Sequence, residues 1–299
     1  MPLSFHPLSL ESQADYKRLF DLCPQSASDY SFVNIWAWRD IYGLEWAWTD
    51  QAVWIRQHHP TLEYWAPVGP WSDMDWSSML RSTLDGRTAF TRIPEHLFQI
   101  WSEQFGSAVD LVPNRDHWDY IYSVEELINL KGNKYHKKKN LLRQFLRKYD
   151  ATYHHLDEEK IEKALTLQTE WCLWRDCEDS TTLEAENQAI LNTFHDWRHL
   201  RDIFGGGLDV EGNMVAYSIA EPLDAQTLVI HFEKGCPGHK GVYQAINQMF
   251  LAQSGSSYAF VNREQDLGDP GLRKAKESYH PVRYLKKFCG TIDPADLAG

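Results

Sequence analysis

The chain has 299 residues, of which 43% are hydrophobic and 24% are charged, a composition typical of a folded protein with two domains of average size. No run of residues is apolar enough to cross a membrane, and the first residues lack the pattern of a signal peptide, so we expect a cytoplasmic protein and leave peripheral membrane contact open. The formal net charge of -12 excludes a protein that coats nucleic acid nonspecifically, because neutralising phosphates requires a basic surface.

The five cysteines are scattered along the chain and form no Cys-x-x-Cys pair. Cys172 and Cys177 are five residues apart, which is off the helical spacing of a shared ligand. We therefore expect neither a disulfide framework nor a metal site, and we expect free thiols.

The first half alternates helical and strand patterns. Predicted helices cover 12–22, 31–42, 76–84 and 94–105, and predicted strands cover 45–48, 52–56, 63–66, 88–91, 108–112 and 120–122. Trp46, Trp48, Trp54 and Trp65 alternate along the first three strands and are expected to fill a core. This order indicates an α+β domain over residues 1–130 that is mainly structural.

Residues 131–150 form a basic segment between the two halves. From residue 131 to 149 the chain has eight Lys and Arg residues and no acid, with apolar residues at helical spacing. The segment therefore predicts an amphipathic connecting helix. Two interpretations of its charge stay open: Lys137, Lys138, Lys139 and Arg143 hold phosphates of a tRNA acceptor stem or a nucleotide, or they form a solvated helix face.

The second half repeats the element order of the first. Predicted helices cover 157–175, 183–200 and 243–253, and predicted strands cover 207–210, 215–221, 227–233 and 258–261. Two helices, three antiparallel strands, a helix and a strand in this order resemble the GNAT acyltransferase fold. We therefore predict an α+β protein of two tandem GNAT-like domains, each a mixed, mostly antiparallel sheet flanked by helices. The second domain, residues 151–299, is expected to hold the active site.

The loop at residues 235–241 follows the third strand of the second half, where the GNAT fold holds a pyrophosphate. Gly238 and Gly241 let backbone N–H groups turn inward, Lys240 adds a positive charge, and the N-terminus of the next helix favours an anion. The usual GNAT signature is reduced here to Lys240 and Gly241, which argues against ordinary use of coenzyme A. The alternative is a plain turn of Gly and Pro.

Two predicted strands end in polar residues suited to acyl transfer. His231 and Glu233 alternate along one strand, and either is a candidate base that deprotonates an attacking amine. Asn262, Glu264 and Asp266 alternate at the end of the next strand and are expected to point to one side. Glu264 is a catalytic candidate, and Asn262 and Asp266 are candidates for binding the acceptor. The alternative is that they cap the next helix and pair with basic residues.

A second basic group follows these acids. Arg273 and Lys276 are candidates for binding phosphates of the donor, or they are the ion-pair partners of the acids. Tyr279 is a candidate acid that protonates a leaving hydroxyl, with a packed aromatic side chain as the alternative.

Several stretches resemble one family when they are taken together. They are LKGNKYHKKKN at 130–140, Glu233, Lys240 with Gly241, NREQDLG at 262–268 and LRKAKESYHP at 272–281. Over nearly the whole chain they resemble an uncharacterised bacterial family related to the C-terminal domain of phosphatidylglycerol lysyltransferase. The resemblance implies two tandem GNAT-like domains, as in the Fem aminoacyl transferases, and aminoacyl-tRNA as a donor.

We therefore expect an acyl or aminoacyl transferase that uses aminoacyl-tRNA or acyl-CoA and acts on an amine or hydroxyl of a small molecule or peptide. Two alternatives stay open: a non-catalytic protein that binds tRNA or a nucleotide, and a diverged coenzyme A-dependent N-acyltransferase. No bound cofactor is predicted. We expect Lys240, Glu264 and Tyr279 to border one cavity between the loop at 235–241 and the strand end at 262–266.

Overall fold

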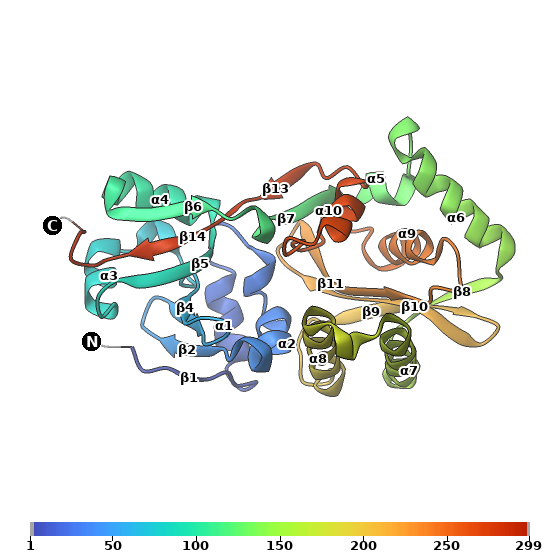
Figure 1. The fold of residues 1–299 in the computed structure, drawn as a ribbon, viewed down its shortest axis with the longest axis horizontal. Helices are drawn as coiled ribbons and strands as arrows, with labels where there is room; N and C mark the ends of the chain where they lie inside the picture. The colour runs from blue at the N-terminus through green and yellow to red at the C-terminus, as the bar shows by residue number, and fades with distance from the viewer. Residues whose placement is uncertain (1–2, 298–299) are drawn as a thin grey trace. The chain divides into compact units, whose positions relative to one another are not determined.

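A computed structural model describes residues 3–297 and divides the chain into two compact units. The first unit takes in the chain up to Asp119, Gln265–Asp269 and the chain from Tyr284 onward, and the second takes in Tyr120–Glu264 and Pro270–Arg283. In Figure 1 the red C-terminal strand lies among blue-green strands from the first half of the chain, and these strands belong to the same unit. The boundaries predicted at residues 130 and 150 are therefore corrected. A strand that returns to an earlier sheet leaves no mark in local sequence patterns.

The first unit is built on a seven-stranded mixed sheet in the order β1-β2-β3-β4-β5-β14-β6. Its strands are β1 (His6–Pro7), β2 (Glu45–Trp48), β3 (Val53–Gln57), β4 (Glu63–Tyr64), β5 (Thr88–Pro94), β6 (Val109–Pro113) and β14 (Lys287–Ile292). Its helices are α1 (Gln13–Phe20), α2 (Phe32–Tyr42), α3 (Trp76–Thr83) and α4 (Glu95–Phe105). β14 pairs with β5 on one side and β6 on the other, so it is a central strand of the first sheet.

Aromatic side chains fill the core of the first unit. Trp46, Trp54 and Trp65 are buried, as their alternation predicted. Trp48 is 37% exposed, which corrects its expected place in the core. It is the last residue of β2, where the strand runs out into a turn.

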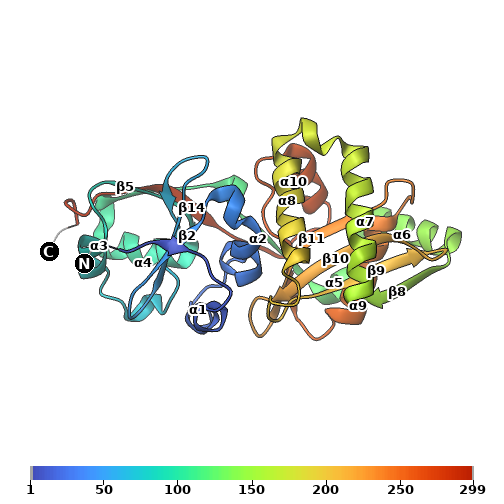
Figure 2. The same ribbon diagram turned by 90° about the horizontal axis from the view of Figure 1, so that it is seen from below.

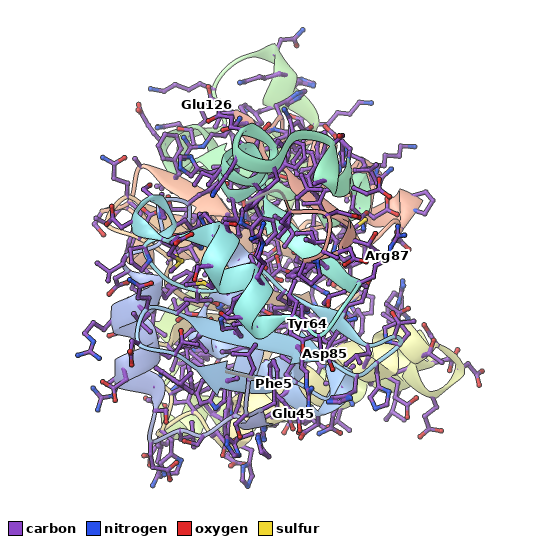
Figure 3. All side chains as sticks on the ribbon, turned by 90° about the vertical axis from the view of Figure 1, so that its left-hand side faces the viewer. Phe5, Glu45, Tyr64, Asp85, Arg87 and Glu126 are labelled. Carbon is purple, nitrogen blue, oxygen red and sulfur yellow. A yellow bond between two sulfur atoms is a disulfide. The ribbon has the colours of Figure 1, made fainter. Side chains whose placement is uncertain are left out.

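An aromatic and charged contact holds the N-terminal segment to the first sheet. Figure 3 labels Phe5, Glu45 and Tyr64 in this region. The rings of Phe5 and Tyr64 meet edge to face with centroids 5.5 Å apart, and the Arg56 guanidinium lies 4.0 Å over Phe5. Arg56 also pairs with Glu45 at 2.7 Å. These contacts fasten Phe5, which precedes β1, to the strands β2, β3 and β4.

Four charged side chains are buried together in the first unit: Asp29, Arg92, Asp119 and Lys287. Arg92 Nε lies 3.0 Å from Asp29, and the ammonium of Lys287 contacts both Asp29 and Asp119. Burial alone would lower the pKa of Lys287, but the two carboxylates outweigh it and raise the pKa, so the ammonium stays charged. The cluster joins β14 to Asp119 and Asp29, which lie 168 and 258 positions earlier in the chain.

The second unit is built on another seven-stranded mixed sheet, in the order β13-β7-β12-β11-β10-β9-β8. Its strands are β7 (Asp119–Ser123), β8 (Ala151–His155), β9 (Phe204–Val210), β10 (Asn213–Pro222), β11 (Thr227–Gly235), β12 (Phe260–Asn262) and β13 (Arg283–Leu285). Its helices are α5 (Val124–Asn129), α6 (His136–Lys148), α7 (Glu158–Arg175), α8 (Thr181–His195), α9 (Val242–Ser254) and α10 (Pro270–Glu277). Figures 1 and 2 show α6 and α9 on one face of this sheet and α7 and α8 on the other.

The fold is α+β, with two mixed sheets flanked by helices, as the sequence predicted. The predicted helices and most strands lie within a few residues of their observed positions, and the basic segment forms α6. The sequence patterns missed β1, α5, β8, β13 and β14. Within the described part, residues 3–297, the helices are too short or too polar to cross a bilayer.

The prediction of free thiols is wrong for one pair of cysteines. Cys172 in the last turn of α7 and Cys177 in the short helix η6 (Cys177–Asp179) form a disulfide. Asp176 adopts a left-handed conformation with φ 50°, which turns the chain back toward α7. Helical spacing does not describe this turn. The free cysteines of the described part are Cys23, Cys236 and Cys289.

Candidate functional site

The second sheet opens between β11 and β12. These two strands run parallel, and their paired register ends at Val229 and Asn262. β12 stops at Asn262, whereas β11 continues to Gly235. Beyond the register the two strands part, and polar side chains from both strand ends face one another there.

His231 on β11 lies just past the paired register and is hydrogen-bonded at both ring nitrogens. Nδ1 lies 2.8 Å from Glu264 Oε1, and Nε2 lies 3.0 Å from Glu221 Oε1. Burial alone would lower the pKa of the imidazole, but the hydrogen bonds to Glu221 and Glu264 outweigh it and raise the pKa to about 9. His231 is therefore an imidazolium at neutral pH, donates both hydrogen bonds and has no lone pair for accepting a proton. This geometry argues against the role of base that the sequence suggested for it.

Glu264 is the most exposed member of this three-residue group. Its side chain is 14% exposed, while those of His231 and Glu221 are 1% and 7% exposed. The group therefore places two carboxylates on one imidazolium. A negative group that is nearly buried and opens to solvent at one carboxylate suits a cationic amine.

The backbone at Glu264 explains why the predicted alternation fails beyond Asn262. Glu264 has a positive φ of 55°, and its N–H donates to Asn262 Oδ1 at 2.8 Å. The chain therefore turns at Glu264 instead of continuing as a strand, and Asn262 acts as the cap of that turn. Asp266 lies in the first unit, where it is buried and pairs with Arg115 at 3.3 Å. The expectation that all three polar side chains point to one side is wrong for Asp266.

Glu233 and Arg263 form a second pair across the opening. Arg263 Nη2 lies 2.8 Å from Glu233 Oε1, and both side chains are at most 14% exposed. Burial alone would lower the pKa of Arg263, but the Glu233 carboxylate outweighs it and raises the pKa. Ser218 and Asn247 donate long hydrogen bonds of 3.4 and 3.5 Å to the other Glu233 oxygen. Glu233 is thereby fixed by partners from β10, α9 and the end of β12.

Tyr279 and Lys138 lie beside this second pair. The Tyr279 ring centroid is 5.1 Å from the Arg263 guanidinium and 3.9 Å from Lys138 Nζ. Burial raises the pKa of Tyr279, so its hydroxyl keeps its proton at neutral pH, and Gln244 Nε2 donates to that hydroxyl at 3.2 Å. Burial and the nearby Arg263 lower the pKa of Lys138 to about 8. Two cations and one carboxylate thus leave a surplus positive charge here, which suits an anion.

α10 supplies one further contact to this region through Lys276. Lys276 Nζ donates to the backbone oxygen of Arg263 at 2.5 Å, so Lys276 orients the strand end. Arg273 lies half-buried on the same helix, three residues earlier. This contact is to the backbone, and the alternative that α10 residues form ion pairs with the acids stays a prediction.

The loop at 235–241 is arranged differently from the expected phosphate cradle. Gly241 begins α9 with φ 91°, and a Cβ there would lie 2.3 Å from the Leu141 carbonyl oxygen of α6. Glycine is therefore required at this position by close packing of two helices. Gly238 and Lys240 are exposed, and the Gly238 carbonyl accepts a long hydrogen bond of 3.5 Å from Tyr149. The predicted cavity that joins Lys240 to Glu264 and Tyr279 stays a prediction.

α6 presents its predicted basic face mostly to solvent. Lys137 and Arg143 are exposed and Lys139 is half-buried, while the apolar side of the helix buries Leu142 and Phe145. Lys138 differs from its neighbours because it reaches Tyr279. The choice between phosphate binding and a solvated face therefore stays a prediction for these side chains.

Sequence reasoning missed two residues of this region. Arg263 lay inside a noticed motif but received no role, and Glu221 ends a predicted strand that appeared to be plain scaffold. A carboxylate at the end of an apolar strand indicates that a partner lies beside it, because burying a charge without a partner is costly. The partner of such a charge lies in another strand, so its identity requires the sheet register.

The family of the chain follows from a comparison with known sequences. The profile of the family described as "Phosphatidylglycerol lysyltransferase, C-terminal" matches residues 20–290. This chain belongs to that family. The matched residues include both the sheet opening and α6.

Solved structures with the same fold agree with this family. A conserved protein of unknown function from Bacteroides thetaiotaomicron is 28% identical, with a TM-score of 0.89 over 97% of this chain and 99% of that one. L-PGS from Bacillus licheniformis is 13% identical, with a TM-score of 0.56 over 85% and 89% of the two chains. FemX is 8% identical, with a TM-score of 0.58 over 96% and 97%. The two lower identities show a shared fold alone.

A curated sequence relative covers less of the chain. The uncharacterized protein MYCGA3080 of Mycoplasmoides gallisepticum is 24% identical over 182 residues, which are 57% of this chain. The match spans about half, 54%, of that relative's length.

Proposed function

We propose that this protein is a cytoplasmic acyl or aminoacyl transferase whose active site is the opening between β11 and β12. The single observation that carries the proposal is the pair of side-chain bridges across that opening, His231 with Glu264 and Glu233 with Arg263. The His231 of the first bridge also pairs with a second carboxylate, Glu221, and the second bridge lies beside the ammonium of Lys138. Membership of the phosphatidylglycerol lysyltransferase C-terminal family supports the reaction class.

The two charges suit the two ends of an aminoacyl ester. The ammonium of the aminoacyl group would bind near Glu264, one of the two carboxylates on His231. The phosphate of a terminal nucleotide would bind near Lys138 and Arg263, where the positive charge is in surplus. The exposed basic residues of α6, Lys137 and Arg143 among them, extend this positive surface and suit the rest of a tRNA.

Proton transfer in the proposed reaction involves Tyr279. The amine or hydroxyl acceptor attacks the ester carbonyl, a new bond forms at that carbon, and the ester bond to the ribose oxygen breaks. That oxygen leaves with a proton, and the Tyr279 hydroxyl, which is protonated at neutral pH, is the candidate donor. His231 is charged already, so its role in this proposal is to hold Glu264 and Glu221 in place.

Aminoacyl-tRNA is favoured over acyl-CoA as the donor for two reasons. In the GNAT fold an extended acyl carrier pairs with backbone between the parted strands, whereas here side-chain bridges cross that space. The start of α9, which would face a pyrophosphate, is packed against the Leu141 carbonyl. We also propose that the two sheets are tandem GNAT-like domains, with the first mainly structural.

The test is a transfer assay on the purified chain. It is incubated with tRNA charged with a radiolabelled amino acid, or with labelled acetyl-CoA, together with amine, peptide and lipid acceptor fractions. The proposal predicts that label moves from tRNA to one acceptor fraction. Binding of tRNA without transfer would favour the non-catalytic alternative, and transfer from acetyl-CoA alone would favour a diverged N-acyltransferase.

A further inference from the structure

The disulfide between Cys172 and Cys177 sits where α7 ends, on the sheet face opposite α9. The two Cα atoms are 5.0 Å apart, a separation within the usual range for disulfides. The four residues between the cysteines are the last three residues of α7 and its cap Asp176, and Leu173 and Trp174 among them are 75% and 56% exposed. Cys172 is half-buried and Cys177 is buried, so Cys172 is the sulfur more open to an incoming thiolate.

We propose that Cys172 and Cys177 form a redox-responsive pair that controls the loop at 235–241, which begins two residues after Glu233 of the proposed active site. The inference rests on the proposed cytoplasmic function in one respect: where thiols are kept reduced, disulfides are generally transient and redox-sensing. In the forming direction two thiols lose two protons and two electrons to a small-molecule disulfide, which becomes two thiols. In the opening direction a thiolate attacks Cys172, Cys177 leaves as a thiolate, and a second thiol releases the mixed disulfide.

Trp171, the neighbour of Cys172, contacts both ends of that loop. Its Nε1 donates to the hydroxyl of Tyr243 at 3.2 Å, and Tyr243 lies in the first turn of α9. Lys234, the residue before Gly235, places its ammonium 3.8 Å from the centroid of the Trp171 ring. The loop therefore begins and ends at residues that touch the side chain next to the disulfide.

Two more contacts connect the pair to the sheet. Lys234 is buried and pairs with Glu186 of α8 at 2.7 Å, so its ammonium has a fixed position over Trp171. Gln168 Nε2 lies 3.7 Å from Cys172 Sγ, and Gln168 Oε1 accepts from the Tyr217 hydroxyl at 2.7 Å. The end of α7 is thus fixed to β10 and β11 when the disulfide is closed.

Opening the disulfide removes the covalent closure of the turn and lets the last turn of α7 fray. Helix ends fray readily when no tertiary contact or cross-link holds them. Trp171 lies in that last turn, so fraying releases its contacts with Lys234 and Tyr243. The loop at 235–241 then loses a support at each end.

Hydrogen exchange measured by mass spectrometry tests this coupling without requiring any activity. The full chain is compared after reduction with a phosphine and after oxidation with glutathione disulfide. We expect amide exchange in the reduced protein to be about tenfold faster or more in the peptide that covers 171–177, and about threefold faster or more in the peptide that covers 235–243. Equal exchange of the 235–243 peptide in the two redox states would overturn the proposal.

Variants and intact masses separate the pair from the free thiols. The double variant Cys172→Ser with Cys177→Ser should show the reduced pattern in both treatments, whereas Cys289→Ser should still switch. Intact mass after oxidation should show the loss of two hydrogens, and alkylation should then leave only Cys23, Cys236 and Cys289 modified. A double variant that still switches, or oxidation that adds glutathione at Cys236 and leaves Cys172 and Cys177 open to alkylation, would overturn the proposal.

Discussion

Lys138 loses its charge at a lower pH than an ordinary lysine. Burial and Arg263 lower its pKa to about 8, so the fraction of charged ammonium falls as the pH rises through that value. If Lys138 binds an anionic donor, the affinity for tRNA should fall over the same range. We expect Lys138→Met to flatten the pH dependence of the dissociation constant, measured between pH 6.5 and 9 at fixed salt.

Lys137 is the matched control for that measurement. It is the preceding residue of α6, carries the same charge and is exposed. Lys137→Met should weaken tRNA binding slightly through the lost charge and keep the dependence on pH. If Lys138→Met retains the full pH dependence, Lys138 does not bind the donor as a cation.

His231 gives a prediction about stability. Its pKa of about 9 in the folded protein lies above the ordinary value of 6.5, so folding takes up a proton between these pH values. The stabilisation is fully present below about pH 6.5 and is lost as the pH rises through about 9, with a total on the order of 3 kcal/mol. Urea unfolding between pH 6 and 10 should show this decline in the natural protein and a flatter profile in His231→Gln. Two profiles that run parallel would contradict a charged His231.

At the same scale, the sequence predicted some of these contacts and not others. His231, Glu233 and Glu264 drew attention because charged residues stood at strand ends. Their pairing could not be predicted, because it depends on β12 ending at Asn262 and on the turn at Glu264. The position of Asp266 could not be predicted for the same reason. The sequence pattern continued the strand of Asn262 through Glu264 to Asp266, whereas Asp266 lies in the first unit.

Two substitutions in the loop at 235–241, at Gly241 and at Gly238, test the contact between α6 and α9. Gly241 has φ 91° and a Cβ there would meet the Leu141 carbonyl at 2.3 Å, so Gly241→Ala requires the helices to move apart. We expect a loss of about 2 kcal/mol or more in the free energy of unfolding.

Gly238→Ala is the control, because a Cβ there meets only Cys236 Sγ at 3.8 Å. Its effect on the free energy of unfolding should stay within about 0.5 kcal/mol. Equal effects of the two substitutions, measured by urea unfolding, would mean that the packing of Gly241 against α6 is not what requires glycine.

Element prediction succeeded where local patterns are strong. α2 begins at a Ser cap and ends at a Gly, and β2 and β3 contain alternating aromatic residues. The sequence therefore predicted the ends of this helix and of these strands to within two residues. β8 has the sequence ATYHH, with no apolar alternation, and it owes its strand conformation to pairing with β9. β14 likewise owes its place to β5 and β6, far away in the chain.

For the whole molecule, the C-terminal strand is predicted to be essential to the first unit. Lys287 is completely buried between Asp29 and Asp119, so Lys287→Met removes one cation from both carboxylates and leaves Arg92 beside Asp29. Breaking a buried pair in this way costs about 3 to 5 kcal/mol, and we expect that loss in thermal or urea unfolding.

Lys286 offers the comparison, since it is adjacent and pairs with Glu95 in a partly exposed bridge of 2.8 Å. Lys286→Met should cost about 1 kcal/mol or less. A Lys287→Met protein as stable as Lys286→Met would show that the buried cluster does not hold β14. The domain boundaries depend on this cluster, which explains why composition and local patterns did not reveal them.

Transfer from charged tRNA is the most direct measurement of what the molecule does. In a single turnover, excess protein is mixed with labelled aminoacyl-tRNA and the active acceptor fraction, and the loss of label from tRNA is followed over time. We predict fast transfer by the natural protein and transfer about 100-fold slower by Tyr279→Phe, because the leaving oxygen loses its proton donor. Tyr153→Phe, which removes only a hydroxyl bonded to Ser254, should match the natural rate. No transfer by the natural protein, or equal rates in the natural and Tyr279→Phe proteins, would contradict an aminoacyl transferase centred on the opening between β11 and β12.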